Sequence, residues 1–75
     1  MNRTLYEQMK KFFDFPFVTN DYPAIHTIGF TYPATYENDA AAEKLADWYA
    51  AYRPWLKCRI THTETEATLV ITRKK

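Results

Sequence analysis

The 75-residue sequence contains no serine, one cysteine and one glycine, and each shortage excludes a kind of chemistry. Without serine there is no serine nucleophile, and a single cysteine cannot form an internal disulfide. Gly29 alone cannot build the glycine-rich loop that binds phosphate groups. The sequence therefore identifies no catalytic residue, and it predicts a protein that is not an enzyme.

Long hydrophobic runs are also missing. No apolar stretch approaches the ~18 residues of a membrane-spanning helix, and the formal net charge is only +1. We therefore expect a soluble, cytoplasmic protein that does not associate with membranes. A chain of this length is expected to form a single domain over residues 1–75.

Aromatic residues, in contrast, are abundant, with five Phe, six Tyr and two Trp. Each can bury about 150–250 Å². They are expected to stabilise a chain so short that it can bury only roughly 60% of its unfolded surface.

Two stretches show the three-and-four spacing of an amphipathic helix. The longer stretch predicts a helix over residues 39–52, which ends before Pro54 because proline has no backbone N–H. Its apolar stripe consists of Ala41, Ala42, Leu45, Trp48, Tyr49 and Tyr52. The shorter stretch predicts a helix over residues 4–13, with a stripe of Leu5, Met9, Phe12 and Phe13.

Three further stretches alternate in the period of a half-buried strand: residues 24–32, 56–62 and 67–73. In the first, His26, Ile28, Phe30 and Tyr32 share one face, and Gly29 indicates a bulge or a close approach of another backbone. A four-residue loop between the last two strands would place Ile60 opposite Leu69 and Cys58 opposite Ile71.

These elements predict an α+β fold in the order α-β-α-β-β. We expect a three-stranded sheet with strand order 1-3-2, because the last strand is apolar on both faces, as central strands are. Both helices should cover the face that carries His26, Ile60 and Ile71. Residues 14–23 are predicted to form an ordered loop.

No metal or cofactor is expected. Cys58 and His62 lie on one predicted strand, where residues four apart are about 13 Å from each other, too far to share an ion. Cys58 is better explained as a small buried hydrophobe. A nucleophilic pair of Cys58 with His26 is conceivable, but nothing in the sequence indicates an oxyanion hole.

Several aromatic residues fall outside the predicted stripes and are candidates for a partner-binding surface: Phe15, Phe17, Tyr22, Tyr36 and Trp55. For Phe15, Phe17 and Tyr22 the first interpretation is a hydrophobic lid over one edge of the core, and an exposed anchor for a partner is the alternative. This surplus of aromatic residues favours a protein-binding module, and a homodimer is one form that such a module can take. By size alone, such a chain is typical of accessory or inhibitor proteins, including those with which phages counter host defences.

The alternative hypothesis is nucleic-acid binding by the C-terminal hairpin. Residues 53–75 hold six basic and two acidic side chains, whereas residues 1–52 hold four basic and seven acidic ones. The candidate phosphate-binding residues are Arg53, Lys57, Arg59, Arg73 and Lys74, followed by Lys75. Against this hypothesis, the outer sheet face is mostly threonine and has no predicted aromatic platform.

Overall fold

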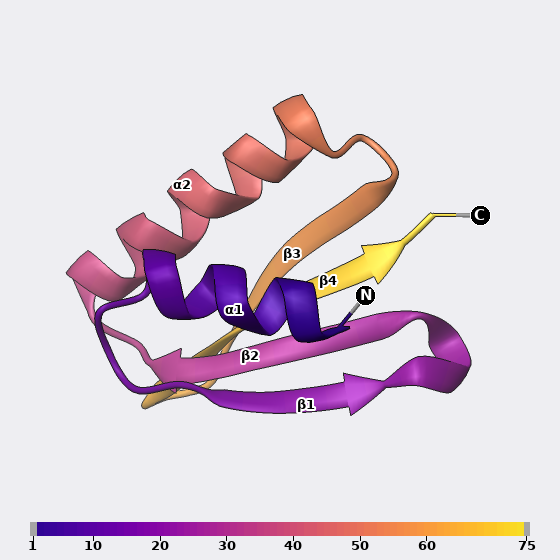
Figure 1. Cartoon of the computed structure of the whole chain (residues 1–75). Coiled ribbons are helices and arrows are strands. Elements are labelled where there is room, and N and C mark those ends of the chain that lie inside the picture. The colour runs from indigo at the N-terminus through magenta and orange to yellow at the C-terminus, as the bar shows by residue number, and fades with distance from the viewer. Residues whose placement is uncertain (1, 75) are drawn as a thin grey trace.

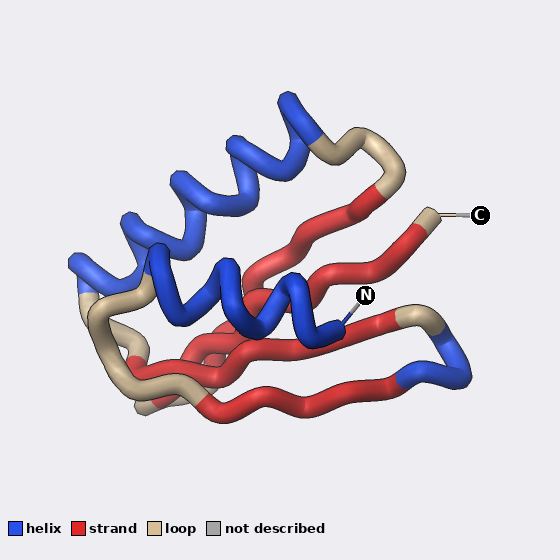
Figure 2. Tube along the Cα trace, viewed as in Figure 1, coloured by secondary structure: helices blue, strands red, loops and turns tan. Residues whose placement is uncertain are grey.

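The chain runs twice through the same unit, a helix followed by a β-hairpin. A computed structural model describes residues 2–74, with side chains from residue 5 onward. The elements are α1 (Asn2–Phe12), β1 (Val18–Tyr22), the short 3-10 helix η1 (Pro23–Ile25), β2 (Thr27–Pro33), α2 (Tyr36–Tyr52), β3 (Leu56–His62) and β4 (Glu66–Arg73). Both helices lie on the same face of the sheet (Figures 1 and 2). The predicted α+β class is confirmed, although the sheet has four strands.

The additional strand is β1, at one edge of the sheet. The strand order is β1-β2-β4-β3, and every neighbouring pair is antiparallel. The prediction of a loop over residues 14–23 therefore holds for residues 14–17 but is wrong for Val18–Tyr22. Thr19, Asn20 and Asp21 are typical turn residues, but an edge strand tolerates them because it needs only one row of backbone bonds and stays in contact with water. The predicted three-stranded order is incomplete, although β4 lies between β2 and β3 as expected.

The strand β2 begins three residues later than predicted. His26 has a left-handed backbone conformation with φ of 51° and is exposed, so the prediction that it faces the core is wrong. Its carbonyl oxygen accepts a hydrogen bond from the backbone N–H of Arg73 at 2.9 Å, which fixes the turn against β4. The other inward residues of this strand, Ile28, Phe30 and Tyr32, are buried as predicted.

Gly29 does not form a bulge, because its pairing with Val70 lies within a continuous register. A Cβ atom at Gly29 would lie 3.2 Å from Cγ2 of Thr68. Gly29 is therefore approached most closely by a side chain of β4, and not by another backbone as the sequence predicted.

The C-terminal hairpin has the predicted register: Ile60 pairs with Leu69, and Cys58 pairs with Ile71. Leu69 and Ile71 are buried beneath the helices, and Cys58 and Ile60 are partly buried against the same core. Alternation then places the remaining side chains on the opposite face, as predicted. They are Lys57, Arg59, Thr61, Thr68, Val70 and Thr72.

The helix α2 starts at Tyr36 and not near Asp39. Its N-cap is Thr35, whose hydroxyl oxygen accepts a hydrogen bond from the backbone N–H of Asn38 at 3.2 Å. Its C-cap is Arg53, directly before Pro54, as the proline predicted. The helix α1 also starts and ends slightly earlier than the predicted range of 4–13.

One core fills the space between the sheet and the two helices. Met9 of α1 and Leu45 and Tyr49 of α2 are buried against Phe30 and Leu69 of the sheet. The Tyr49 hydroxyl donates a hydrogen bond to Gln8 Oε1 at 2.8 Å, so the helices are tied to each other as well. None of the helices in residues 2–74 is long and apolar enough to cross a membrane.

Candidate partner-binding surface

Two of the five predicted partner-binding residues pack against the core. Phe15 stacks on Phe13 with ring centroids 4.5 Å apart and lies 5.4 Å from Tyr32. Phe17 meets Phe30 edge to face at 5.7 Å. Both rings are partly buried, so they match the hydrophobic lid and not an exposed anchor.

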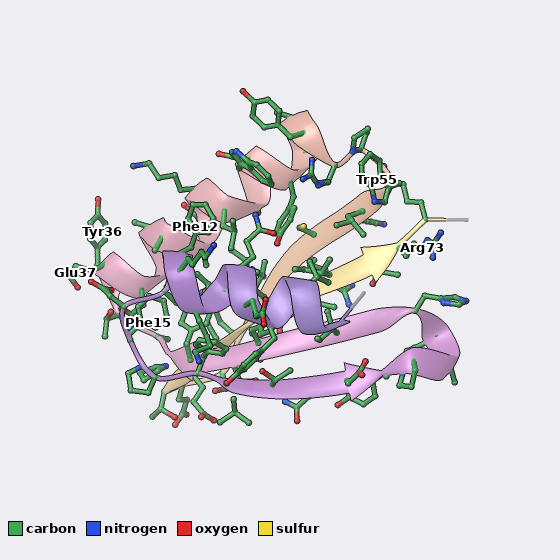
Figure 3. The ribbon with its side chains drawn as sticks, viewed as in Figure 1. Phe12, Phe15, Tyr36, Glu37, Trp55 and Arg73 are labelled. Carbon is green, nitrogen blue, oxygen red and sulfur yellow. The ribbon has the colours of Figure 1, made fainter. Side chains whose placement is uncertain are left out.

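The other three predicted residues are exposed but lie in separate places. Tyr22 pairs with Thr27 and therefore points to the open face of the sheet, away from the helices. Tyr36 is the first residue of α2 and Trp55 lies just beyond its last turn, so a 17-residue helix about 25 Å long separates them. Figure 3 shows Tyr36 and Trp55 at opposite ends of the molecule. The five residues do not form one surface.

A continuous exposed surface exists elsewhere, and we call it the aromatic–arginine cluster: Phe12, Trp48, Tyr52, Arg53 and Trp55. Trp48 lies at its centre, with its ring centroid 6.4 Å from that of Phe12 and 5.2 Å from that of Tyr52. The Arg53 guanidinium lies 5.2 Å from the Trp48 centroid and 5.7 Å from the Trp55 centroid, so it connects the two indoles.

The exposure of the cluster follows from how α2 sits on the sheet. Tyr49 points into the core, whereas Trp48 and Tyr52, four residues apart, lie along the flank of the helix. Tyr52 is 60% exposed, Phe12 50% and Trp55 52%, while Trp48 is partly buried. The sequence-based assignment of Phe12 and Tyr52 to the core is therefore wrong.

The turn after α2 fixes Arg53 and Trp55. The Arg53 backbone N–H donates to the Tyr49 carbonyl at 2.7 Å, and its Nη1 donates to the Tyr52 carbonyl at 3.0 Å. The Leu56 N–H donates to the Arg53 carbonyl at 2.9 Å, which closes the turn around Pro54. Hydrogen bonds to the backbone at the end of α2 thus hold the Arg53 part of the cluster in place.

The sequence held one signal for this surface. The aromatic part of the α2 stripe, with Trp48, Tyr49 and Tyr52 in a single turn and a half, is wider than one helix needs to cover a sheet. Phe12 carried no comparable signal, because only the tertiary fold brings the end of α1 beside Trp48.

The five predicted phosphate-binding residues divide into two groups. Lys57 and Arg59 point to the open sheet face, where they line a hollow of about 180 Å³ together with Val70 and Thr72. Arg53, Arg73 and Lys74 lie at the Trp55 end of the molecule, where the Lys74 N–H donates to the Trp55 carbonyl at 2.8 Å. Lys75 lies outside the described residues.

Two buried tyrosines and the partly buried Cys58 have pKa values raised above their ordinary values. Burial raises the pKa of Cys58 to about 11 and that of Tyr49 to about 12, because an apolar surrounding disfavours the anion. Burial, and then the hydrogen bond to Asp39, also raises the pKa of Tyr32. Cys58 therefore lacks the thiolate that nucleophilic catalysis needs at neutral pH.

Residues that could bind a metal do not gather. Within the described residues, no three His, Cys, Asp or Glu side chains lie close enough to hold an ion. His62 Nε2 instead lies 3.1 Å from Asp39 Oδ1 at the first turn of α2, and His26 occupies the turn before β2.

Comparison with known proteins identifies no relative: no protein family, no characterised protein and no solved structure matches this chain.

Proposed function

We propose that this chain is a small, non-enzymatic protein-binding module and that the aromatic–arginine cluster is its binding surface. The observation that carries the proposal is that Phe12, Tyr52 and Trp55, each at least half exposed, are joined through Trp48 and Arg53 into one surface. Trp, Tyr and Arg are the residues most enriched at energetic hot spots of protein interfaces.

The way Arg53 is held also supports binding. Its guanidinium is fixed over two indole rings and bonded to the Tyr52 carbonyl, so little side-chain entropy is left to lose when a partner binds. We include in the proposal an accessory or inhibitor role in the cytoplasm, in which the module acts by covering a surface of a larger protein. That role rests on size analogy.

The test compares exposed aromatics of matched exposure. Immobilised wild-type protein and three variants, Tyr52→Ala, Trp55→Ala and Tyr22→Ala, are used to capture partners from cell lysate, and retained proteins are identified by mass spectrometry. Tyr22 is the control, because it is 52% exposed like Trp55 but points to the open sheet face. We expect one protein to be retained by wild type and by Tyr22→Ala but lost from the other two, with thermal melts unchanged.

Capture that is unaffected by Tyr52→Ala and Trp55→Ala would contradict the proposal. Loss of capture with Tyr22→Ala alone would move the binding surface to the open sheet face.

The second candidate is nucleic-acid binding on that open sheet face, favoured by the hollow that Lys57 and Arg59 line. Binding of single-stranded DNA there should weaken steeply with salt, with a slope of about 0.7 per phosphate contact, and should disappear in the Lys57→Glu, Arg59→Glu double variant. We favour protein binding, because the other three candidate cations lie at the Trp55 end and do not extend this face into a continuous track.

A further inference from the structure

The two ends of the molecule carry opposite charge. We define the acidic end by Glu37, Glu64 and Glu66, together with Tyr36, and the basic end by Arg53, Arg73 and Lys74, together with Trp55. Figure 3 shows Tyr36 and Glu37 at one end and Trp55 and Arg73 at the other.

Backbone contacts hold each end together. At the acidic end, the Ala34 N–H donates to the Thr65 carbonyl at 3.0 Å, which places the β3–β4 loop beside the start of α2. At the basic end, Arg73 pairs with Leu56, and the neighbouring Lys74 N–H bonds to the Trp55 carbonyl. The charges of each end are therefore gathered by the fold from residues distant in sequence.

These charges are not neutralised within the described chain. None of the six end residues has an oppositely charged group within ion-pair distance among the described residues. The ends are about one α2 length apart, roughly 25 Å, which is well beyond the ~8 Å screening length at physiological salt. The two ends can therefore compensate each other only between molecules.

We infer that the basic end binds the acidic end of a second copy of this chain, head to tail. Tyr36, at the acidic end, is 87% exposed. Its ring can therefore pack against Trp55 and Arg53 of the second copy. The inference rests on the proposed function in one respect, namely that the receiving surface includes Trp55. Because the two contacting surfaces differ, the contact is heterologous and can continue from copy to copy.

The experiment measures the mass of the full chain by sedimentation at about 0.02 M and about 0.5 M salt, a range over which the screening length falls several-fold. Two variants reverse one end each: Arg73→Glu with Lys74→Glu, and Glu64→Lys with Glu66→Lys. The control is Lys57→Glu with Arg59→Glu, which changes the net charge as much as the first variant but on the open sheet face.

We expect wild type and control to associate at low salt and to separate at high salt. Each end-reversed variant should remain a monomer, and an equimolar mixture of the two should associate again, because one supplies an intact basic end and the other an intact acidic end. Thermal melts of each variant establish that it is folded.

Three results would overturn the inference: a wild-type mass of one chain at low salt, association that survives reversal of either end, or a mixture that stays monomeric. Any of these combined with continued capture of another protein through Tyr52 and Trp55 would leave the proposed function intact. Restored association in the mixture, without any capture that depends on Tyr52 and Trp55, would instead support this inference and reject the part of the proposed function that assigns a different protein as the partner.

Discussion

The hydroxyl of Tyr32 donates a hydrogen bond to Asp39 Oδ1 at 3.0 Å, and this bond joins β2 to the first turn of α2. The Tyr32 side chain is otherwise buried, and the same carboxylate oxygen lies 3.1 Å from His62 Nε2 on β3. A single carboxylate thus connects a helix and two strands.

Loss of this carboxylate should therefore destabilise the fold. We expect Asp39→Ala to cost about 1–3 kcal/mol, because it leaves the Tyr32 hydroxyl without its partner. Tyr32→Phe should cost less, since it removes the hydroxyl together with its need for a partner. Urea denaturation measures both, and a larger loss for Tyr32→Phe than for Asp39→Ala would contradict the role of the bond.

Stability should fall at alkaline pH. The ordinary pKa values of Cys and Tyr are 9.0 and 10.0, and the folded pKa values of Cys58, Tyr32 and Tyr49 are raised above them. Above those ordinary values the unfolded chain loses protons first, so it gains stability relative to the folded state. The contribution of Cys58 is fully present below pH 9.0 and is lost as the pH rises toward its folded pKa of about 11.

The measurement is the urea midpoint from neutral pH upward. It should begin to fall near pH 9.0, and Cys58→Ala should delay the fall toward the tyrosine range near pH 10.0. A midpoint that stays level or rises over this interval would show that the buried groups are not held in their protonated forms.

Trp48 and Tyr49 are neighbours in sequence but should differ in their contribution to stability. Tyr49 is fully buried, so Tyr49→Ala should cost about 3–5 kcal/mol. Trp48 is only partly buried, so Trp48→Ala should cost less, about 1–2 kcal/mol. Chemical denaturation of the two variants gives the comparison. If Trp48→Ala proves the more damaging, then Trp48 lies in the core and not on the proposed surface.

Gly29 and Thr68 should be energetically coupled. Gly29→Ala places a methyl group 3.2 Å from Thr68 Cγ2, so one of the two strands has to shift slightly. Thr68→Ser removes that Cγ2, and in its presence Gly29→Ala should become neutral or stabilising. A double-mutant cycle measures the coupling, and simple additivity of the two changes would argue against the close approach.

Local patterns predicted much of the fold. The spacing of Leu45, Tyr49 and their neighbours indicated α2, and the alternation around Ile60 and Leu69 indicated the C-terminal hairpin together with its register. Such patterns succeed where one face of an element is buried, because burial imposes the period of the element on its apolar residues. The edge strand β1 has no fully buried residue, so its sequence shows no alternation of apolar and polar residues. Thr19, Asn20 and Asp21 therefore resembled a turn.

The candidate surface was less predictable than the fold. Trp55 was among the predicted partner-binding residues because it lies outside the helical stripe, and Arg53 was in the alternative set because it belongs to the basic C-terminal segment. Phe12 and Tyr52 follow the apolar period of their helices and were therefore assigned to the core. A period shows which side of a helix turns toward the sheet, but it does not show how far the neighbouring elements extend over that side.

The sequence by itself determined that this chain forms amphipathic helices and half-buried strands, that it has no serine nucleophile or internal disulfide, and that its basic residues concentrate after residue 52. Only the tertiary structure decided that Phe12 lies beside Trp48, that Arg53 joins two indoles, and that Glu64 and Glu37 share one end. The physical reason is that these contacts connect residues far apart in the chain, and packing of whole elements against one another sets their geometry, which no local period records.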